Sequence, residues 1–446
     1  MTDHFRIRYS SWGKLLGSDV ALPILGLLSL REVAVAGTIS WSLSHSVSQY
    51  AASAVQKWHP RPFLLSKALP LQQLLLADRL SARSKVALSD ACALLVFGGS
   101  VFSVTGFQAR RRSTAGQPYV ARLPAREPTA SVTLARLRNG GSMPLVVSES
   151  NTLSCANGLQ TKRDLWQMCL PGMLNVHMVA AGFNHVLIVL TSGKVLSCGH
   201  TGSGALGHGD QHCRNLPSEI DTFKGVPIAY AAAGSDHSIF ISRSSEAFSC
   251  GKGCHGQLGL GSTEDSFLPQ RIEKLPDRQV VRCAVGGNAS CFLSCNGSAW
   301  TCGKGKFGLL GHGDRQDLLV PKRIGYFCPT MCAFVECALG PRHGLLLSRD
   351  CIESLLCKGS PLKARVFGLG SNDAGQLGTM PETEALCPKE IVLPHGSPPV
   401  AVAVNTNISL ILLQDGTALV LMQGECSTCM LGQDEWTCAP VPCVSW

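Results

Sequence analysis

Short apolar runs of five or six residues recur along the chain, and most of them are bounded by Gly, Asn, Asp or Pro. In residues 186–190 every position is aliphatic. Apolar runs of this length between turn-forming residues are typical of strands that are covered on both faces of a sheet. The pattern therefore predicts an all-β protein built from many short strands.

Pairs of glycines recur among these runs at a constant spacing. In three successive units the first glycine is followed by a second one 17 residues later, and the units are 52 residues apart. A proline closes each unit, at Pro217, Pro269 and Pro321. A fourth unit begins at Gly340, and its second glycine aligns with Gly368. The glycines of the first three units are Gly182 and Gly199, Gly234 and Gly251, and Gly286 and Gly303.

A unit of about 50 residues has room for four short strands with their turns, which is the size of one β-propeller blade. Such a sheet cannot bury both faces alone, so successive sheets are expected to pack face to face around an axis. The glycines suit positions where strands crowd together or where a turn requires a positive φ. We predict a single β-propeller of about seven four-stranded blades, and six to eight blades are consistent with the repeats.

The repeats differ in clarity along the chain, although one propeller domain is expected to span residues 1–446. The N-terminal part departs most from the pattern. The predicted parts are degenerate blades with a closing strand at 1–84, degenerate blades with a basic loop at 108–138 within 85–174, clear repeats at 175–392 and a C-terminal blade at 393–446.

Each clear unit has the same order: a glycine, a histidine three positions later, an apolar strand, a strand that ends at glycine, a Gly-Gln-Leu-Gly-like turn and a proline. The histidines are His185, His237 and His343, and Ala289 takes this place in the third unit. This order resembles the regulator of chromosome condensation repeat family. The family's Trp before the second glycine is replaced here by Cys198, Cys250, Cys302 and Phe367.

The resemblance implies a β-propeller, commonly of about seven blades. It also implies a ring that is closed by pairing of the N- and C-terminal segments. Trp12 and Gly13 suit the closing strand.

The composition agrees with this fold class. Apolar residues make up 45% of the chain and charged residues only 15%, which excludes a disordered chain of high net charge. The 46 glycines argue against a mainly helical protein, because glycine destabilises a helix interior.

Positive charge is concentrated in one stretch. The chain has 39 Lys and Arg against 30 Asp and Glu, a net charge of +9. Residues 108–138 contain seven arginines and one acid, Glu127. Arg110, Arg111 and Arg112 are expected in an exposed loop, which Lys304 and Lys306 could extend as part of one partner-binding face. Such a loop suits the phosphates of an RNA- or DNA-containing particle, and a solvated loop without a partner is the alternative.

Motifs that suggest chemistry coincide with the repeat. Gly-x-Gly-x-x-Gly occurs three times, but a phosphate-binding loop needs a helix directly after it, and a glycine loop and a proline follow instead. His208 with Asp210, and His312 with Asp314, also recur at the repeat period. These residues are therefore expected to be turn and loop positions. We predict no enzyme activity, no catalytic residue and no cofactor.

The 21 cysteines are odd in number, and many lie in apolar strand-like runs. Free cysteine packs as a small apolar residue, so a reducing intracellular compartment is expected. Cys426 and Cys429 form a lone Cys-x-x-Cys pair with Cys438 and Cys443 downstream. Zinc or redox chemistry stays open at this pair, but a metal site normally needs a well-spaced second pair, so no metal is predicted.

Targeting signals are weak. No secretory signal is visible, and the apolar run at residues 21–30 is too short to span a membrane. The nucleus or cytoplasm is favoured. The basic start, with Arg6, Arg8 and Lys14, leaves a mitochondrial location open.

Three functions fit these observations. A non-enzymatic scaffold that binds other proteins within a larger complex fits the repeat and the lack of a catalytic set. A component or assembly partner of a ribonucleoprotein or chromatin particle would use the arginine-rich loop. A guanine nucleotide exchange factor for a small GTPase is what the founding member of the resembled family implies.

Overall fold

The computed structural model describes the backbone of most of the chain after residue 85. The chain divides into two units at Ala82, and the described residues all belong to the second, Arg83–Trp446. The predicted closing strand at Trp12 and Gly13, and the predicted blades at 1–84, lie outside the described residues. The described residues are 86–88, 92–97, 100–105, 119–123, 129–136, 142–155, 175–200, 202–275, 279–325, 332–350, 364–378, 382–393, 397–422, 425–431 and 436–441.

Within residues 83–446 the described strands form seven antiparallel sheets, which confirms the predicted all-β propeller. Five sheets have four strands, one has three and the last has five. Two 3₁₀ turns, η1 at Asp221–Phe223 and η2 at Lys306–Gly308, lie between strands of the described part.

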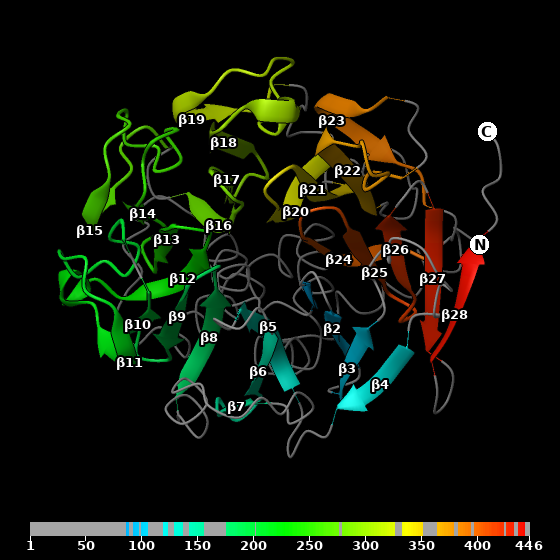
Figure 1. The fold of residues 1–446 in the computed structure, drawn as a ribbon, viewed down its shortest axis with the longest axis horizontal. Helices are drawn as coiled ribbons and strands as arrows, with labels where there is room; N and C mark the ends of the chain where they lie inside the picture. Colours follow the sequence, from blue (N-terminus) through cyan, green and yellow to red (C-terminus); the bar gives the residue numbers. More distant parts are fainter. Residues whose placement is uncertain are drawn as a thin grey trace, which may run out of the picture. The chain divides into compact units, whose positions relative to one another are not determined.

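The first strand of each sheet is innermost, and each contacts the first strand of the next sheet (Figure 1). The last of these strands contacts the earliest one, so the seventh sheet packs beside the first. These inner strands are β1 Val86–Leu88, β5 Thr129–Arg136, β8 Val176–Ala181, β12 Ile228–Ala233, β16 Val280–Val285, β20 Cys332–Leu339 and β24 Pro399–Val404.

The second strands form the core between neighbouring sheets. Alternate residues of the strand at His185–Leu190 enter two different apolar clusters, Val186 and Ile188 in one and Leu187 and Val189 in the other. A strand with an apolar cluster on each face needs an apolar residue at every position, which explains the continuous runs in the sequence. The second strands are β2 Cys92–Phe97, β6 Ser142–Ser148, β9 His185–Leu190, β13 His237–Ser242, β17 Ala289–Ser294, β21 His343–Asp350 and β25 Ser409–Leu413.

The third strands add small buried side chains to these clusters. Cys198 and Cys250 are buried and pack with the aliphatic residues of neighbouring sheets. Cysteine thus fills, as a small apolar side chain, the place where the family pattern has Trp. The third strands are β3 Ser100–Thr105, β7 Leu153–Cys155, β10 Val195–Gly199, β14 Ala247–Gly251, β18 Ala299–Gly303, β22 Ala364–Ser371 and β26 Ala418–Met422.

The outer strands carry the prolines of the repeat. A strand edge with free N–H groups invites pairing with other chains, and a proline in the strand removes a donor. Pro269, Pro321 and Pro388 also lie against a glycine turn of the preceding blade, as Pro269 does at Gly207. The outer strands are β4 Tyr119–Leu123, β11 Arg214–Glu219, β15 Ser266–Arg271, β19 Leu318–Arg323, β23 Glu384–Ile391, and β27 Glu425–Leu431 with β28 Trp436–Val441.

No described sheet combines strands from the two ends of residues 83–446. The last sheet instead uses five consecutive strands, β24 to β28, and β28 contacts β4 of the first sheet. The expected pairing with an N-terminal segment concerns residues outside the described part and stays a prediction.

Candidate functional site

The first glycine of each repeat lies at the inner end of its sheet, where neighbouring sheets meet. A Cβ atom on Gly182 would overlap the carbonyl oxygen of Gly234, and the N–H of Phe183 donates to that same carbonyl at 3.0 Å. The 52-residue spacing is therefore a steric requirement of the inner ring. The same close approach joins Gly234 to Gly286, Gly286 to Gly340 and Gly340 to Asn405.

The second glycine ends the third strand of each sheet, directly opposite the histidine position. Gly199 pairs with His185 and has a φ of 129°, which a residue with a side chain rarely adopts. In the fourth unit His343 pairs with Gly370, whose φ is 94°. The second glycine of this unit is therefore Gly370, two residues after the predicted Gly368. The other pairs are His237 with Gly251 and Ala289 with Gly303.

The repeat histidines join neighbouring sheets at what we call the seams. His185 Nε2 lies 2.8 Å from Ser238 Oγ of the next sheet, and Ser238 donates its only hydroxyl proton to the Ala205 carbonyl at 2.7 Å. The serine must then accept, so His185 carries its proton on Nε2. The same arrangement joins His237 to Ser290 and the Gln257 carbonyl, and His343 to Ser409 and the Gln376 carbonyl.

Burial keeps these histidines neutral. Desolvation lowers the pKa of His185 to about 4 and those of His237 and His343 to about 3. Within the described part of the chain, Nδ1 of His185 and of His237 has no hydrogen-bond partner. A proton added there would place an unpaired charged N–H in the core. The three histidines are thus structural.

One seam lacks both members of this pair. Between the sheets β16–β19 and β20–β23, the histidine place is Ala289 and the serine place is Gly344. A Cβ on Gly344 would lie 2.7 Å from Leu339 Cδ1, so the leucine occupies this space. Leu339, which is larger than Val285 at the same place in the preceding sheet, thus replaces the two polar partners with one apolar side chain.

The seam hydrogen bonds should be measurable as stability. Ser290→Ala leaves the His237 N–H and the Gln257 carbonyl without this partner, so the free energy of unfolding should fall by about 1–3 kcal/mol. Urea denaturation at neutral pH measures the loss. Thr263→Ala, at an exposed loop position, is the control and should change little. Equal effects of the two substitutions would contradict this seam.

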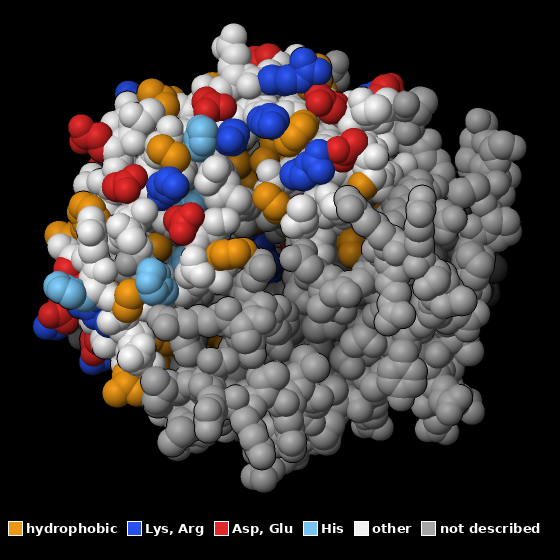
Figure 2. Space-filling view, in the orientation of Figure 1, with side chains coloured by type: hydrophobic (Ala, Val, Ile, Leu, Met, Phe, Trp, Pro, Cys, Tyr) orange, Lys and Arg blue, Asp and Glu red, His pale blue; other side chains and the backbone are white. Residues whose placement is uncertain are grey.

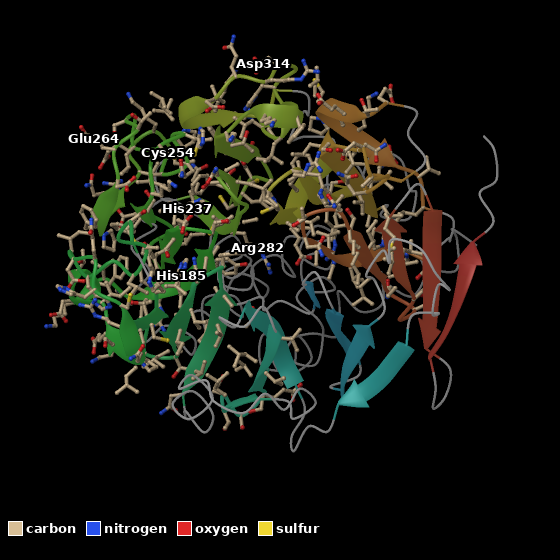
Figure 3. All side chains as sticks on the ribbon, in the orientation of Figure 1. His185, His237, Cys254, Glu264, Arg282 and Asp314 are labelled. Carbon is tan, nitrogen blue, oxygen red and sulfur yellow. The ribbon has the colours of Figure 1, made fainter. Side chains whose placement is uncertain are left out.

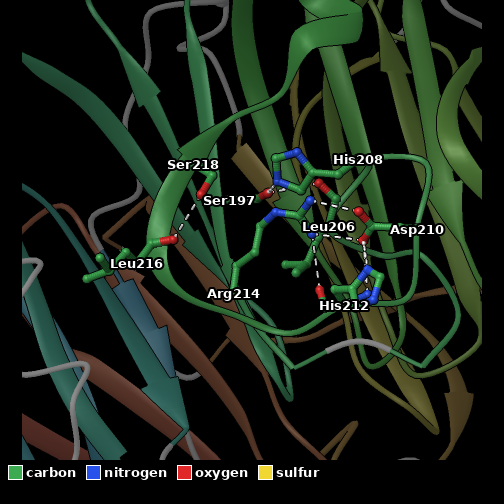
Figure 4. Close-up of polar contacts among 8 residues, drawn as sticks. All are labelled: Ser197, Leu206, His208, Asp210, His212, Arg214, Leu216 and Ser218. Atoms are coloured by element: carbon green, nitrogen blue, oxygen red, sulfur yellow. Dashed lines mark hydrogen bonds and ion pairs between the residues drawn. The ribbon is translucent and has the colours of Figure 1, made fainter.

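The loop histidines are also held by the fold (Figure 4). His208 Nε2 is 2.8 Å from Ser197 Oγ, which is fully buried and donates to the Leu206 carbonyl. Asp210 makes two hydrogen bonds with Arg214 and none with His208, and these bonds lower its pKa. A Ser-His-Asp triad needs the acid on the histidine, so this group stabilises a turn.

Polar residues lie on the inner strands just after a bulge in each strand. Tyr230, Arg282 and Glu336 hold the same position in three successive sheets. The Arg282 guanidinium carbon is 5.8 Å from the Tyr230 ring centre, and burial raises the pKa of Glu336. Figure 3 shows Arg282 near the centre of the view, with His185 and His237 on the inner sides of neighbouring sheets and Cys254, Glu264 and Asp314 farther out.

The loop face is the end of the sheets that carries the first-to-second turns and the third-to-fourth loops. Because strands alternate in direction, these connections lie at one end and the other turns lie at the opposite end. The predicted partner residues Lys304 and Lys306 lie on this face, in the loop between β18 and β19. The described residues of the third-to-fourth loops are 200, 202–213, 252–265, 304–317, 372–378 and 382–383.

The sequence prediction missed an aromatic residue in this loop. Phe307 has a φ of 65° and stacks with two cations, Lys306 Nζ and Arg342 Cζ, each 4.8 Å from the ring centre. Its position, four residues after the second glycine, is Ser203, His255 and Ala374 in the other described loops. The repeat period hides such a residue, because it marks what the units share.

Several sequence predictions fall on residues without a described environment. Arg110, Arg111 and Arg112 lie outside the described residues. Cys426 and Cys429 lie in β27, whose backbone pairs Cys429 with Cys438, but their side chains are not described. In the part of the chain with described side chains, no group of His, Cys, Asp and Glu could hold a metal ion. Among the same residues we find no helix with the length and apolar character of a membrane span.

Comparisons with known proteins agree with this architecture. The Regulator of chromosome condensation (RCC1) repeat matches residues 192–241, 244–293, 296–347 and 363–412. Each match starts after the second strand of one sheet and ends in the second strand of the next, so one sequence repeat contains one seam. The ultraviolet-B receptor UVR8 of Arabidopsis thaliana is 28% identical over 230 residues, which are 52% of this chain and 49% of that protein. The chain thus spans about half the length of this relative.

Two solved structures show the same fold. Human WBSCR16 has a TM-score of 0.55 and 20% identity, covering 72% of this chain and 85% of its own. Prp20p of Saccharomyces cerevisiae has a TM-score of 0.55 and 19% identity, covering 82% and 88%. Identities this low carry the fold and no more.

Proposed function

Because the chain belongs to the regulator of chromosome condensation repeat family, we propose that it is a non-enzymatic β-propeller scaffold. It binds other proteins through the loop face and acts within a larger complex.

The observation that carries this proposal is the contrast between the seams and the loop face. Three of the seams repeat the same histidine–serine pair, whereas one slot of the loops holds Ser203, His255, Phe307 or Ala374. Constant inner positions preserve the ring. Varied outer positions on a fixed backbone are what a recognition surface requires.

Two further functions are narrower proposals. Prp20p was described with binding properties to Gsp1p and histones, and a small GTPase or a chromatin particle is a corresponding partner for this chain. The arginine-rich stretch 108–138 gives a nucleic-acid-containing particle a specific point of contact. Both differ from the scaffold in what they require: nucleotide release in one case, and a nuclease-sensitive association in the other.

Cross-linking of the full chain in its native cells, followed by mass spectrometry, tests the scaffold. We expect cross-links to a partner protein from Lys252, Lys304 and Lys306 on the loop face. Lys194 and Lys224, at the opposite end of the sheets, should give none. Recovery of no partner, or cross-links from the opposite end alone, would refute the proposal. Loss of the association after nuclease treatment would favour the particle, and accelerated nucleotide release would favour the exchange factor.

A further inference from the structure

Phe307 is held in an unfavourable backbone conformation. Its φ of 65° and ψ of 11° lie in the left-handed region, which a bulky residue rarely occupies. The residues at the same slot of the other described loops, Ser203, His255 and Ala374, do not have a positive φ. Strain of this kind persists where the surroundings impose it, and it often marks a functional site. Here it places the ring against the neighbouring sheet.

The ring joins cations from two sheets. Lys306 comes from its own loop, and Arg342 comes from the turn between β20 and β21. Arg342 is paired with Asp373, which fixes its position. Lys304 and Lys306 form no ion pair within the described part of the chain, so their charge is available to a partner.

A further basic residue, on the preceding sheet, extends this surface around the propeller. Lys252 holds, one sheet earlier, the same slot as Lys304, and both backbone N–H groups bond the preceding turn, at Asp236 and Asn288. Lysines therefore recur on the loop face of neighbouring sheets, next to the aromatic ring.

The surrounding charges favour a protein over a nucleic acid. Asp314, Asp317 and Asp373 lie within the same loops, and Figure 2 shows acidic side chains among the Lys and Arg in the upper part of the view. A polyanion would meet these acids along its length. A short acidic segment can instead contact the lysines and lay an apolar side chain against the ring.

We propose that Lys304, Lys306, Phe307 and Arg342 form a docking site for an acidic, partly apolar segment of a partner protein. This site rests on the scaffold function and names the chemistry of its partner. Carboxylates of the segment pair with the two lysines, and its apolar side chains pack on Phe307.

The test uses the full chain and a fluorescein-labelled peptide of alternating Glu and Leu, followed by anisotropy. A Gln–Leu peptide is the neutral control, and a single-stranded oligo-dT of similar length tests the nucleic acid. We expect the acidic peptide to bind and its affinity to fall as salt is added. The double variant Lys304→Gln, Lys306→Gln should weaken it by about tenfold or more.

The variant Phe307→Gly tests the contribution of the aromatic ring to binding without disturbing the fold. Glycine adopts a φ of 65° without strain, so this variant should fold at least as well as the parent while losing affinity for the peptide. Lys194→Gln with Lys224→Gln removes two exposed lysines from the opposite end and should leave affinity unchanged. Unchanged affinity in both loop variants, or preferential binding of oligo-dT, would overturn the site.

The same loop variants distinguish this site from the scaffold function. If the loop variants still cross-link to the cellular partner through the loop face, the scaffold function stands and the docking site is wrong. If no partner is found for the parent chain either, the scaffold function fails.

Discussion

Lowering the pH from 7 towards 4 should destabilise residues 83–446, and three buried histidines should account for a large part of the loss between pH 6.5 and 4. His185, His237 and His343 have pKa values of about 4, 3 and 3 in the folded chain, against 6.5 for a free histidine. At these three side chains the unfolded chain therefore binds protons in a pH range in which the folded chain binds few.

The sign follows from this difference. A histidine whose folded pKa is lowered contributes its full stability above pH 6.5, and this stability is lost as the pH falls towards its folded pKa. Each shift corresponds to about 3–5 kcal/mol once the pH lies below the folded pKa. The sum is comparable to the roughly 5–15 kcal/mol that stabilises a typical folded domain.

Carboxyl groups act in a different range. Hydrogen bonds from Arg214 lower the pKa of Asp210, and a hydrogen bond from Ser371 lowers that of Asp373. Their stability is therefore lost only below about pH 4. Burial raises the pKa of Glu336, so acid favours the folded form at this residue and opposes the histidines. Burial also lowers the pKa of two loop histidines, His208 and His312, the latter to about 4, so they add to the loss of stability above pH 4. The part of this loss that a seam variant removes is the part that reports the seams.

Urea denaturation at a series of pH values between 7 and 4 measures the effect. The seam between β16–β19 and β20–β23 supplies the control, because it has Ala289, Leu339 and Gly344 in place of the polar pair. Its transplant to the preceding seam is His237→Ala, Val285→Leu, Ser290→Gly. In this variant, the slope of the unfolding free energy against pH should fall by the equivalent of about one bound proton. An unchanged dependence would show that the seam histidines do not control it.

The seams also show what the sequence could predict. The glycine spacing could predict the inner ring because the first glycine of each unit lies against the backbone of the next unit. The same lack of space therefore requires a glycine once in every repeat. The partners His237 and Ser290 are 53 residues apart and both visible, yet no local pattern says that they meet across two sheets. Only the structure shows that Ala289 and Gly344 replace one such pair together.

The candidate site was harder to predict for a related reason. Lys304 and Lys306 were found by their charge, but Phe307 stands where other units have small or polar residues and breaks no rule of composition. Its importance comes from a backbone angle and from Arg342, which lies on another sheet. Gly368 shows the opposite error. Phe367 before it matches the family's pair of an aromatic residue and a glycine, whereas the strand register pairs His343 with Gly370.

Replacing one glycine of the inner ring with alanine should strongly destabilise the propeller. Gly286→Ala places a Cβ atom in overlap with the carbonyl oxygen of Gly340 and 3.2 Å from Leu339 Cγ. A backbone oxygen cannot rotate away as a side chain can, so two inner strands must separate. Overpacking of this kind costs typically 1–3 kcal/mol, and we expect about 3 kcal/mol or more here because the obstacle is backbone.

Gly202→Ala is the matched control for this ring, because it adds the same methyl group at a site with no atom within 4 Å of the new Cβ. Neither Gly202 nor Gly286 has a positive φ, so neither substitution forces alanine into the left-handed region. Urea denaturation should show a large fall in the free energy of unfolding for Gly286→Ala and little change for Gly202→Ala. If the two variants were equally stable, the close approach of neighbouring sheets could not be the reason for the glycine spacing.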